Sequence, residues 1–191
     1  CETVCYAGKL ERVYKGVKEV LLHNWNLLKE ADHDTMCTLL SEMIDDFRKD
    51  CDKKEAEKLF RIHWDGDFFS SDYAFAWKHV ILNNPDIQFW VYTRVATAAE
   101  MLKGIDNLSL YYSTDKDNKE IAITLRKEHG IKLAYLADTF AIGQADLKVM
   151  LGKPGAKCPE NKKAIPLIDK DGSACVKCSL CVDNKADIVF S

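Results

Sequence analysis

Residues 59–68 read Leu-Phe-Arg-Ile-His-Trp-Asp-Gly-Asp-Phe, a run of β-branched and aromatic residues that ends in an acidic turn. A run of this composition is typical of a buried strand, and a glycine between two acids is typical of the turn that follows one. Three further runs of similar composition follow at residues 87–92, 108–112 and 131–136. The sequence therefore predicts four regularly spaced strands.

Helical segments separate these strands. One ends before Pro85, and two others occupy residues 96–103 and 119–129. Two earlier segments, residues 10–29 and 35–48, also place apolar residues at helical spacing. Alternation of strand and helix favours parallel strands joined by helical crossovers, so we predict an α/β fold.

The composition changes after Gly152. Prolines and glycines become frequent in residues 153–191, which also contain four cysteines. We therefore predict two parts, a strand-and-helix domain at residues 1–152 and a cysteine-rich metal-binding tail at residues 153–191.

The cysteines of the tail form the strongest motif. The chain of 191 residues has eight cysteines, and Cys175, Cys178 and Cys181 form a C-x2-C-x2-C run with Cys158 upstream. Closely spaced thiols allow one short loop to wrap a metal, whereas disulfides favour sulfurs from separate elements. We predict that these four cysteines bind a [4Fe–4S] cluster, with zinc as the alternative.

The other cysteines and the histidines give weaker signals. Cys1 and Cys5 have C-x3-C spacing, which lets one loop supply two thiolates, so we predict that they also bind metal. Cys37 has no partner at ligand spacing and is interpreted as a small core residue. His33 and His79 are interpreted as surface or capping groups.

Polar residues follow the predicted strands. Functional groups gather at the carboxyl ends of parallel strands. We expect a small-molecule site on this rim, formed by Asp65, Gly66, Asp67, Thr93, Arg94 and Ser113. Arg94 would hold a carboxylate or phosphate of the ligand, and the alternative is an ion pair with Asp67 or Asp115.

Several segments together resemble one known family. They are Cys5-Tyr6-Ala7 before a long helix, residues 61–70, residues 89–94, Asn107-Leu108-Ser109-Leu110 and the Cys175–Cys181 run. In this order they look like the "gene product 88" domain family of phages and plasmids. The resemblance covers nearly the whole chain and implies a phage- or plasmid-encoded protein in the cytoplasm of a bacterial host.

A more distant similarity is to radical S-adenosylmethionine enzymes, which have a parallel (β/α) partial barrel. In those enzymes a cysteine loop holds a [4Fe–4S] cluster, and a glycine–acid motif after the next strand meets the amino group of S-adenosylmethionine. Cys1 and Cys5 stand in the position of the loop, and Gly66-Asp67 in that of the motif. The similarity implies a radical-SAM-like partial barrel with S-adenosylmethionine as a cofactor.

The sequence departs from that pattern at Gly8, where the usual loop has its third cysteine. A working radical enzyme would need a first strand and a third ligand from residues upstream of Cys1. One alternative is a non-catalytic phage or plasmid protein with a structural zinc or iron–sulfur site. A second alternative is a metal-dependent hydrolase that uses His63, Asp65 and Asp67.

Charge and hydropathy exclude some partners. The net charge is −3 with both signs interspersed, which does not indicate a nucleic-acid-binding surface. No apolar run approaches the roughly 18 residues that a membrane span needs, and no secretory signal is expected.

Overall fold

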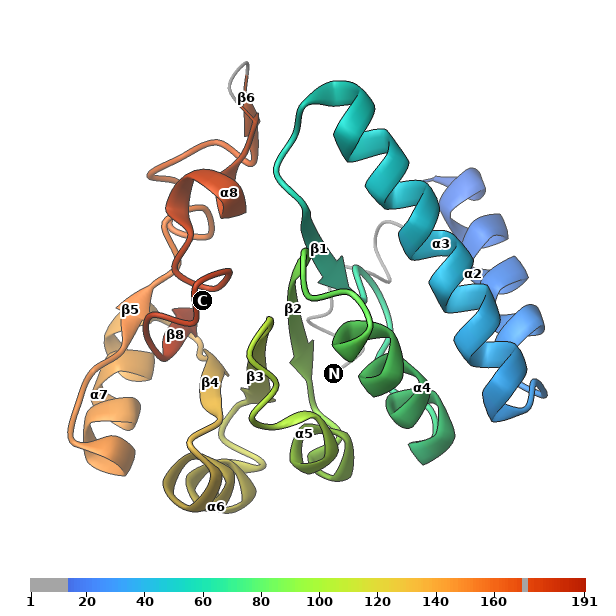
Figure 1. Ribbon diagram of the computed structural model, residues 1–191. Helices are drawn as coiled ribbons and strands as arrows, with labels where there is room; N and C mark the ends of the chain where they lie inside the picture. The colour runs from blue at the N-terminus through green and yellow to red at the C-terminus, as the bar shows by residue number, and fades with distance from the viewer. Residues whose placement is uncertain (1–13, 170–171) are drawn as a thin grey trace.

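The sheet is parallel throughout. The computed structural model describes residues 14–169 and 172–191 (Figure 1). Its main sheet has the order β1-β2-β3-β4-β8-β5, and every pair of neighbours is parallel. The strands are β1 (Leu59–Ile62), β2 (Gln88–Thr93), β3 (Leu108–Thr114), β4 (Lys132–Leu136), β5 (Ala156–Lys157) and β8 (Ile188–Phe190). The α/β fold and the four predicted strands are confirmed, and residues 153–191 supply the last two strands.

Four helices lie along one face of the sheet: α4 (Ser71–Leu82), α5 (Ala96–Leu102), α6 (Lys119–His129) and α7 (Phe140–Leu151). The first four strands are neighbours in chain order, and right-handed crossovers then place every connecting helix on the same side. Figure 1 shows the strands in an arc with these helices on its outside. The inside of the arc is therefore open to other parts of the chain.

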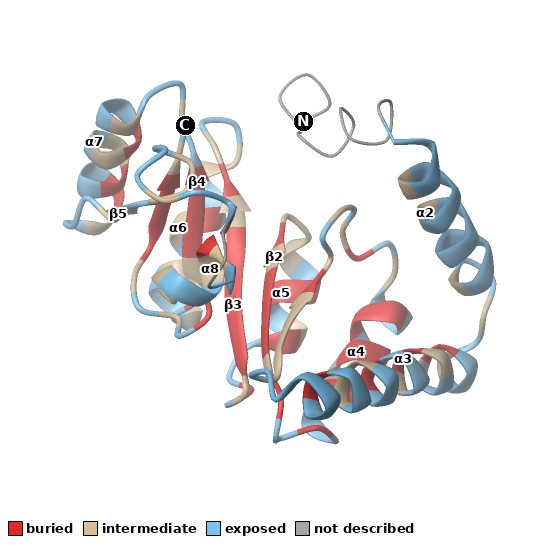
Figure 2. Cartoon of the chain, turned by 90° about the horizontal axis from the view of Figure 1, so that it is seen from above, coloured by how far each residue is buried: buried red, intermediate tan, exposed pale blue. Residues whose placement is uncertain are grey.

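Two more helices precede the sheet. α3 (His33–Lys54) begins at Asp32, whose side chain accepts a hydrogen bond from the Thr35 amide at 2.8 Å. It packs on α4 and buries Met36 and Ile44. α2 (Lys15–Leu28) buries no residue and lies outermost (Figures 1 and 2).

Side chains alternate between two clusters across the sheet. On β3, Leu108, Leu110 and Tyr112 pack toward the helices, whereas Tyr111 belongs to a second cluster on the other face. Helix α7 packs closely on β8. A Cβ added at Gly143 of α7 would lie only 2.4 Å from Val189 Cγ1. Gly143 is required here for close packing rather than for a turn.

The inner face of the arc is covered by the tail. There α8 (Ala174–Cys178) follows a small antiparallel pair, β6 (Ile168–Asp169) and β7 (Gly172–Ser173). The hydroxyl of Tyr111 donates to the carbonyls of Leu180 (3.2 Å) and Ala186 (3.1 Å), and Ser109 donates to the Val182 carbonyl. These bonds tie the segment that carries the last cysteine to the middle of the sheet.

A partly buried ion pair ties the residue before β8 to α6 and β4. The carboxylate of Asp187 accepts from Arg126 Nε at 2.9 Å and from the Leu133 amide at 2.8 Å. Asp187 is only 9% exposed, so both partners are needed to compensate its charge. Within residues 14–169 and 172–191, no helix is long and apolar enough to cross a membrane.

Candidate metal centres

The four tail cysteines lie after β5, on α8 and just after α8. Cys158 follows β5 at the carboxyl end of the sheet, Cys175 and Cys178 lie one turn apart on α8, and Cys181 follows that helix. Ser179 ends α8 in a left-handed conformation with φ of 51°, which turns the chain back toward the sheet. All four are free, half-buried thiols.

These thiols interact with one another. Burial raises the pKa of Cys158 and Cys175, and it raises that of Cys181 to about 12. The charges of the other three tail cysteines raise the pKa of Cys181 further, and those of Cys158 and Cys178 do the same for Cys175. Ionisation of one of these thiols opposes ionisation of the others, and a bound cation would offset that repulsion.

Side chains of the sheet face the same cluster. The hydroxyl of Tyr92 on β2 donates a hydrogen bond to Cys181, which lowers the pKa of that thiol against the larger effect of burial. Arg61 on β1 lies over the Tyr92 ring, 5.1 Å from its centroid, and its charge lowers the pKa of Cys175. The inner face therefore offers one hydrogen-bond donor and one cation that favour thiolates.

The backbone after Cys158 also favours a thiolate. The amides of Glu160 and Asn161 donate to the Cys158 sulfur, and both bonds lower its pKa against the larger effect of burial. Pro159, between Cys158 and Glu160, has no amide hydrogen to offer. Hydrogen bonds to the charged form are the arrangement expected around a metal ligand.

The spacing of the four sulfurs bears on the size of the group that they could hold. Among the described residues, no three of these sulfurs lie within 4.8 Å of one another. Four thiolates around one Zn²⁺ at about 2.3 Å would lie about 3.8 Å apart. The four thiols are a donor set that metals accept, and they are more widely spaced here than the ligands of a single zinc ion.

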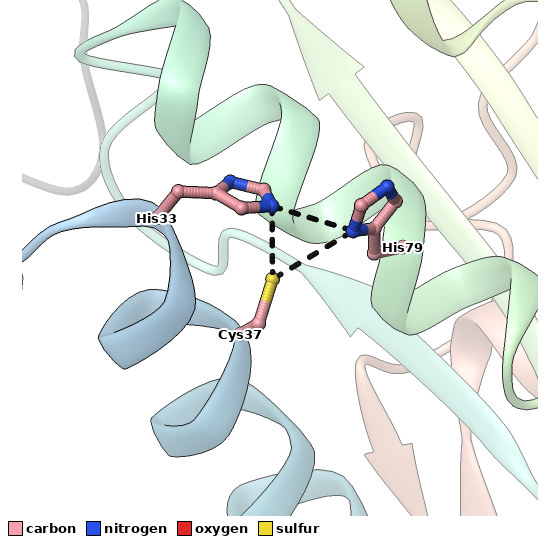
Figure 3. Close-up of side chains that lie close together, drawn as sticks. All are labelled: His33, Cys37 and His79. Atoms are coloured by element: carbon pink, nitrogen blue, oxygen red, sulfur yellow. Dashed lines mark hydrogen bonds between the residues drawn. The ribbon is translucent and has the colours of Figure 1, made fainter.

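A second cluster lies where α3 meets α4. His33 Nε2 and His79 Nδ1 are 3.3 Å apart, and Cys37 Sγ lies 3.4 Å from the first and 4.0 Å from the second. Figure 3 shows the three side chains pointing toward one common centre. Among the described residues, this trio alone brings three ligand atoms within 4.8 Å of one another.

The sequence interpretation missed this cluster. His33 and His79 were expected at the surface or as caps, and Cys37 in the core. His33 and Cys37 are four residues apart on α3 and share a helix face, but His79 is 46 residues away from His33. The H-x3-C spacing was the only available signal, and packing of α3 on α4 supplies the rest.

The predicted rim residues form a hydrogen-bonded network. Asp67 accepts from Thr93 Oγ1 at 2.6 Å and from the Arg94 amide at 2.7 Å, which joins the loop after β1 to the end of β2. The Arg94 guanidinium makes a bidentate ion pair with Asp115 at 2.7 and 3.0 Å and lowers the pKa of that carboxyl. The pairing with Asp115 is the alternative that the sequence left open.

The remaining rim residues are less connected. Asp65 Oδ1 accepts from the Gly66 amide at 2.6 Å, while its Oδ2 is buried without a hydrogen-bond partner among the described residues. Gly66 has φ of 81°, a conformation that suits glycine. Ser113 lies on β3 on the same side as Tyr111, and its side chain is half-buried.

His63 is a half-buried imidazole directly after β1. It adopts φ of 57°, and its Nε2 lies 3.2 Å from the Tyr73 hydroxyl. Burial lowers the pKa of His63 to about 4. In the described part of the chain, His63, Asp65 and Asp67 do not bring three ligand atoms within 4.8 Å, so the hydrolase alternative gains no support.

Two further predictions concern Cys1 and Cys5 and a small-molecule site at the rim. Cys1 and Cys5 lie outside the described residues, so their ligation stays a prediction. A hollow of about 390 Å³ lies at the amino ends of β2 and β3, between Gln88, His129 and Asn184, and not among the rim residues.

Fold and clusters together define a class: an α/β protein with a parallel sheet and cysteine-containing clusters suited to metal. The chain belongs to the gene product 88 family, whose sequence profile matches residues 1–184. It is 54% identical over 193 residues to the Gene 88 protein of Mycobacterium phage L5, and 53% identical over 194 residues to that of Mycobacterium phage D29. Each match covers all of this chain and 78% of the phage protein. No solved structure matches the chain.

Proposed function

We propose that this chain is an iron–sulfur protein in which Cys158, Cys175, Cys178 and Cys181 hold one [4Fe–4S] cluster. The observation that carries the proposal is the convergence of four free, mutually interacting thiols on the inner face of the sheet. Their spread exceeds that of ligands around one ion. A cubane of four irons bound by four cysteines is larger and suits this spread better than zinc does.

The surroundings favour the same assignment. Tyr92 and the amides after Cys158 donate to cluster-facing sulfurs, and hydrogen bonds of this kind tune the reduction potential of iron–sulfur clusters. The cluster would be half-buried against aromatic residues of the sheet. It would lie on the inner face of the sheet, between Cys158 after β5 and Cys181 opposite the middle of β3.

A more specific version of this proposal is that the protein is an enzyme of the radical S-adenosylmethionine type. The sequential order of β1 to β4 with helices on one face supports it. It requires a second cluster at Cys1 and Cys5 and a cofactor that contacts the rim at Asp65, Gly66 and Asp67. Asp67 Oδ1 accepts from Thr93 Oγ1 and from the Phe68 amide, whereas Oδ2 accepts only from the Arg94 amide, so the second lone pair of Oδ2 is the one that the ammonium of the cofactor would use.

Anaerobic purification followed by iron and sulfide quantification tests the proposal. We expect a brown protein with roughly four irons and four sulfides per chain from the tail, and roughly eight of each if Cys1 and Cys5 bind a second cluster. Cys178→Ser should lose the tail cluster. Cys5→Ala separates the two cases, because it lowers the iron content only if the second cluster exists.

The matched control is Cys51→Ser, which changes a cysteine of α3 that lies outside both clusters. Its iron content should equal that of the parent protein. A colourless protein that holds one zinc at the tail and no iron after anaerobic reconstitution contradicts the proposal and favours the structural zinc alternative.

A further inference from the structure

We propose that His33, Cys37 and His79 form a second, separate metal site, one that binds a single Zn²⁺ between α3 and α4. No step of this proposal depends on the tail cluster, because the two sites share no residue and lie on different elements. The evidence is the geometry of three ligand atoms, the identity of the donors and their packing.

The geometry matches one tetrahedral ion. Zinc bonds of about 2.0–2.1 Å to nitrogen and 2.3 Å to sulfur place two nitrogens about 3.3 Å apart and a nitrogen and sulfur about 3.6 Å apart. The corresponding distances are 3.3 Å for His33 Nε2 to His79 Nδ1, and 3.4 and 4.0 Å from Cys37 Sγ to the two nitrogens. Small side-chain rotations would suffice to close the remaining difference.

The donors select the class of ion. Two imidazoles and one thiolate form a borderline-soft set, which zinc accepts and which Mg²⁺ and Ca²⁺ do not prefer. Burial and the charge of Asp34 both raise the pKa of Cys37, so the free thiol stays protonated near neutral pH. Binding must therefore release its proton, and affinity should rise with pH.

The packing holds the imidazoles in place before metal arrives. The ring of Phe75 contacts both His33 and His79, with centroids 5.1 and 4.5 Å away. His33 and Cys37 are held by α3, whose Met36 and Leu40 are buried in the core. Ligands whose rotamers are restricted in this way lose little freedom on binding.

The fourth coordination position faces solvent. His33 and Cys37 are half-buried and His79 is exposed, and no fourth protein ligand lies within reach among the described residues. Three protein ligands with an open position are the arrangement that leaves room for water or an exchangeable ligand. The site would clamp α3 to α4 and still present a Lewis-acidic ion at the surface.

The alternative explanation is a metal-free, hydrogen-bonded trio. The same distances allow the Cys37 thiol to donate to one imidazole and one imidazole to donate to the other. The two explanations differ in tautomer. A bound ion requires that His33 carry its proton on Nδ1 and that His79 carry its proton on Nε2, because the other nitrogen of each ring faces the metal.

Titration of the holoprotein with Zn²⁺ and Co²⁺ against a chromophoric chelator tests the site. We expect one equivalent beyond the tail metal, a thiolate-to-cobalt charge-transfer band, and a loss of affinity of at least about 100-fold in His79→Ala and Cys37→Ala. Long-range ¹H–¹⁵N correlation spectra should show the two predicted tautomers only after Zn²⁺ is added. Mg²⁺ should produce no change.

His23→Ala and Cys51→Ala are the matched controls, and both should bind Zn²⁺ as the parent protein does. His79 is exposed, so its replacement leaves the core intact even if Cys37→Ala folds poorly. Equal Zn²⁺ affinity in His79→Ala and the parent protein, or no charge-transfer band with Co²⁺, overturns the proposal.

Discussion

The tail cysteines and the helix trio present metal-binding side chains in opposite ways. The tail has four thiols close together in sequence, spread so that no three of these described sulfurs lie within 4.8 Å. The trio draws its ligands from positions up to 46 residues apart, yet gathers them into a triangle of 3.3 to 4.0 Å. Closeness in sequence and closeness in space are therefore separate properties.

The difference follows from what holds each set. The tail cysteines are held by α8 and by the hydrogen bonds of Tyr111 to the carbonyls of Leu180 and Ala186, and this framework keeps their sulfurs apart. The trio is positioned by packing between α3 and α4, which exists without metal. We infer that the tail is suited to a group large enough to reach all four separated sulfurs, and the trio to one ion that enters a preformed triangle.

Crossed substitutions would break this comparison most clearly. Cys178→Ser should remove about four irons and leave the Zn²⁺ at α3 and α4 in place. His79→Ala should remove the Zn²⁺ and leave the iron content and visible spectrum unchanged. Metal analysis of both variants measures the two effects in the same preparations.

Two results would contradict the expectation that the two metal sites are independent. If His79→Ala also lowers the iron content, the two sites are coupled, and the trio cannot be an independent site. If Cys178→Ser lowers only zinc and never iron, the tail holds zinc and its spread in the free protein closes on binding.

The next effect concerns how the tail is attached. Asp187→Ala should destabilise the protein by about 3 kcal/mol, because it leaves Arg126 and the Leu133 amide without their shared carboxylate. Since β8 carries the end of the tail into the sheet, iron retention should fall as well. Urea unfolding measures the first effect and iron content the second, with Asp187→Asn as the control that keeps an acceptor for the Leu133 amide.

The sequence was sufficient for the strand-and-helix part of the fold. Alternation of apolar runs predicted β1 to β4 and the helices between them, because buried parallel strands are nearly all apolar toward the helices. It missed α7, in which the interior Gly143 weakens the helical signal and is explained only by close contact with Val189. It also did not predict β5 and β8, which are two and three residues long.

The sites were predicted unevenly for a physical reason. The ligands of a metal-binding loop lie a few residues apart in the sequence. The four tail cysteines could therefore be singled out from the sequence alone. Arg94 was assigned to a ligand, but Asp115 pairs with it across two strand ends. His79 joins His33 only through packing of α3 on α4, and no spacing rule reports a contact between separate helices.

The next prediction concerns the stability of the fold in acid, to which His63 contributes. The pKa of His63 falls from 6.5 to about 4 on folding, mainly through burial, a difference of 2.5 units that corresponds to about 3 kcal/mol. The unfolded chain takes up this proton below pH 6.5 and the folded chain does not. Stability from this group is therefore complete above pH 6.5 and is lost as pH falls toward 4.

His63→Asn tests this assignment, since asparagine tolerates the left-handed φ of 57° and does not titrate. Unfolding free energies between pH 7 and pH 4 should decline less steeply in the variant. An unchanged pH slope would show that other groups cause the acid sensitivity. If the unfolding free energy of His63→Asn hardly changes with pH but the protein still releases metal in acid, protonation of the cysteine and histidine ligands causes that release.

The smallest expected effect lies at the rim, which has neither cysteines nor a gathered ligand set. Arg94→Lys should lose the bidentate pairing with Asp115 and cost about 1 kcal/mol or less, because the two side chains are 35% and 23% exposed. Iron and zinc contents should equal those of the parent protein, since neither site touches Arg94. Calorimetry with S-adenosylmethionine on both proteins completes the test. Weaker binding by Arg94→Lys would make the rim a third ligand site. Equal binding would leave Arg94 as a residue that joins the ends of β2 and β3.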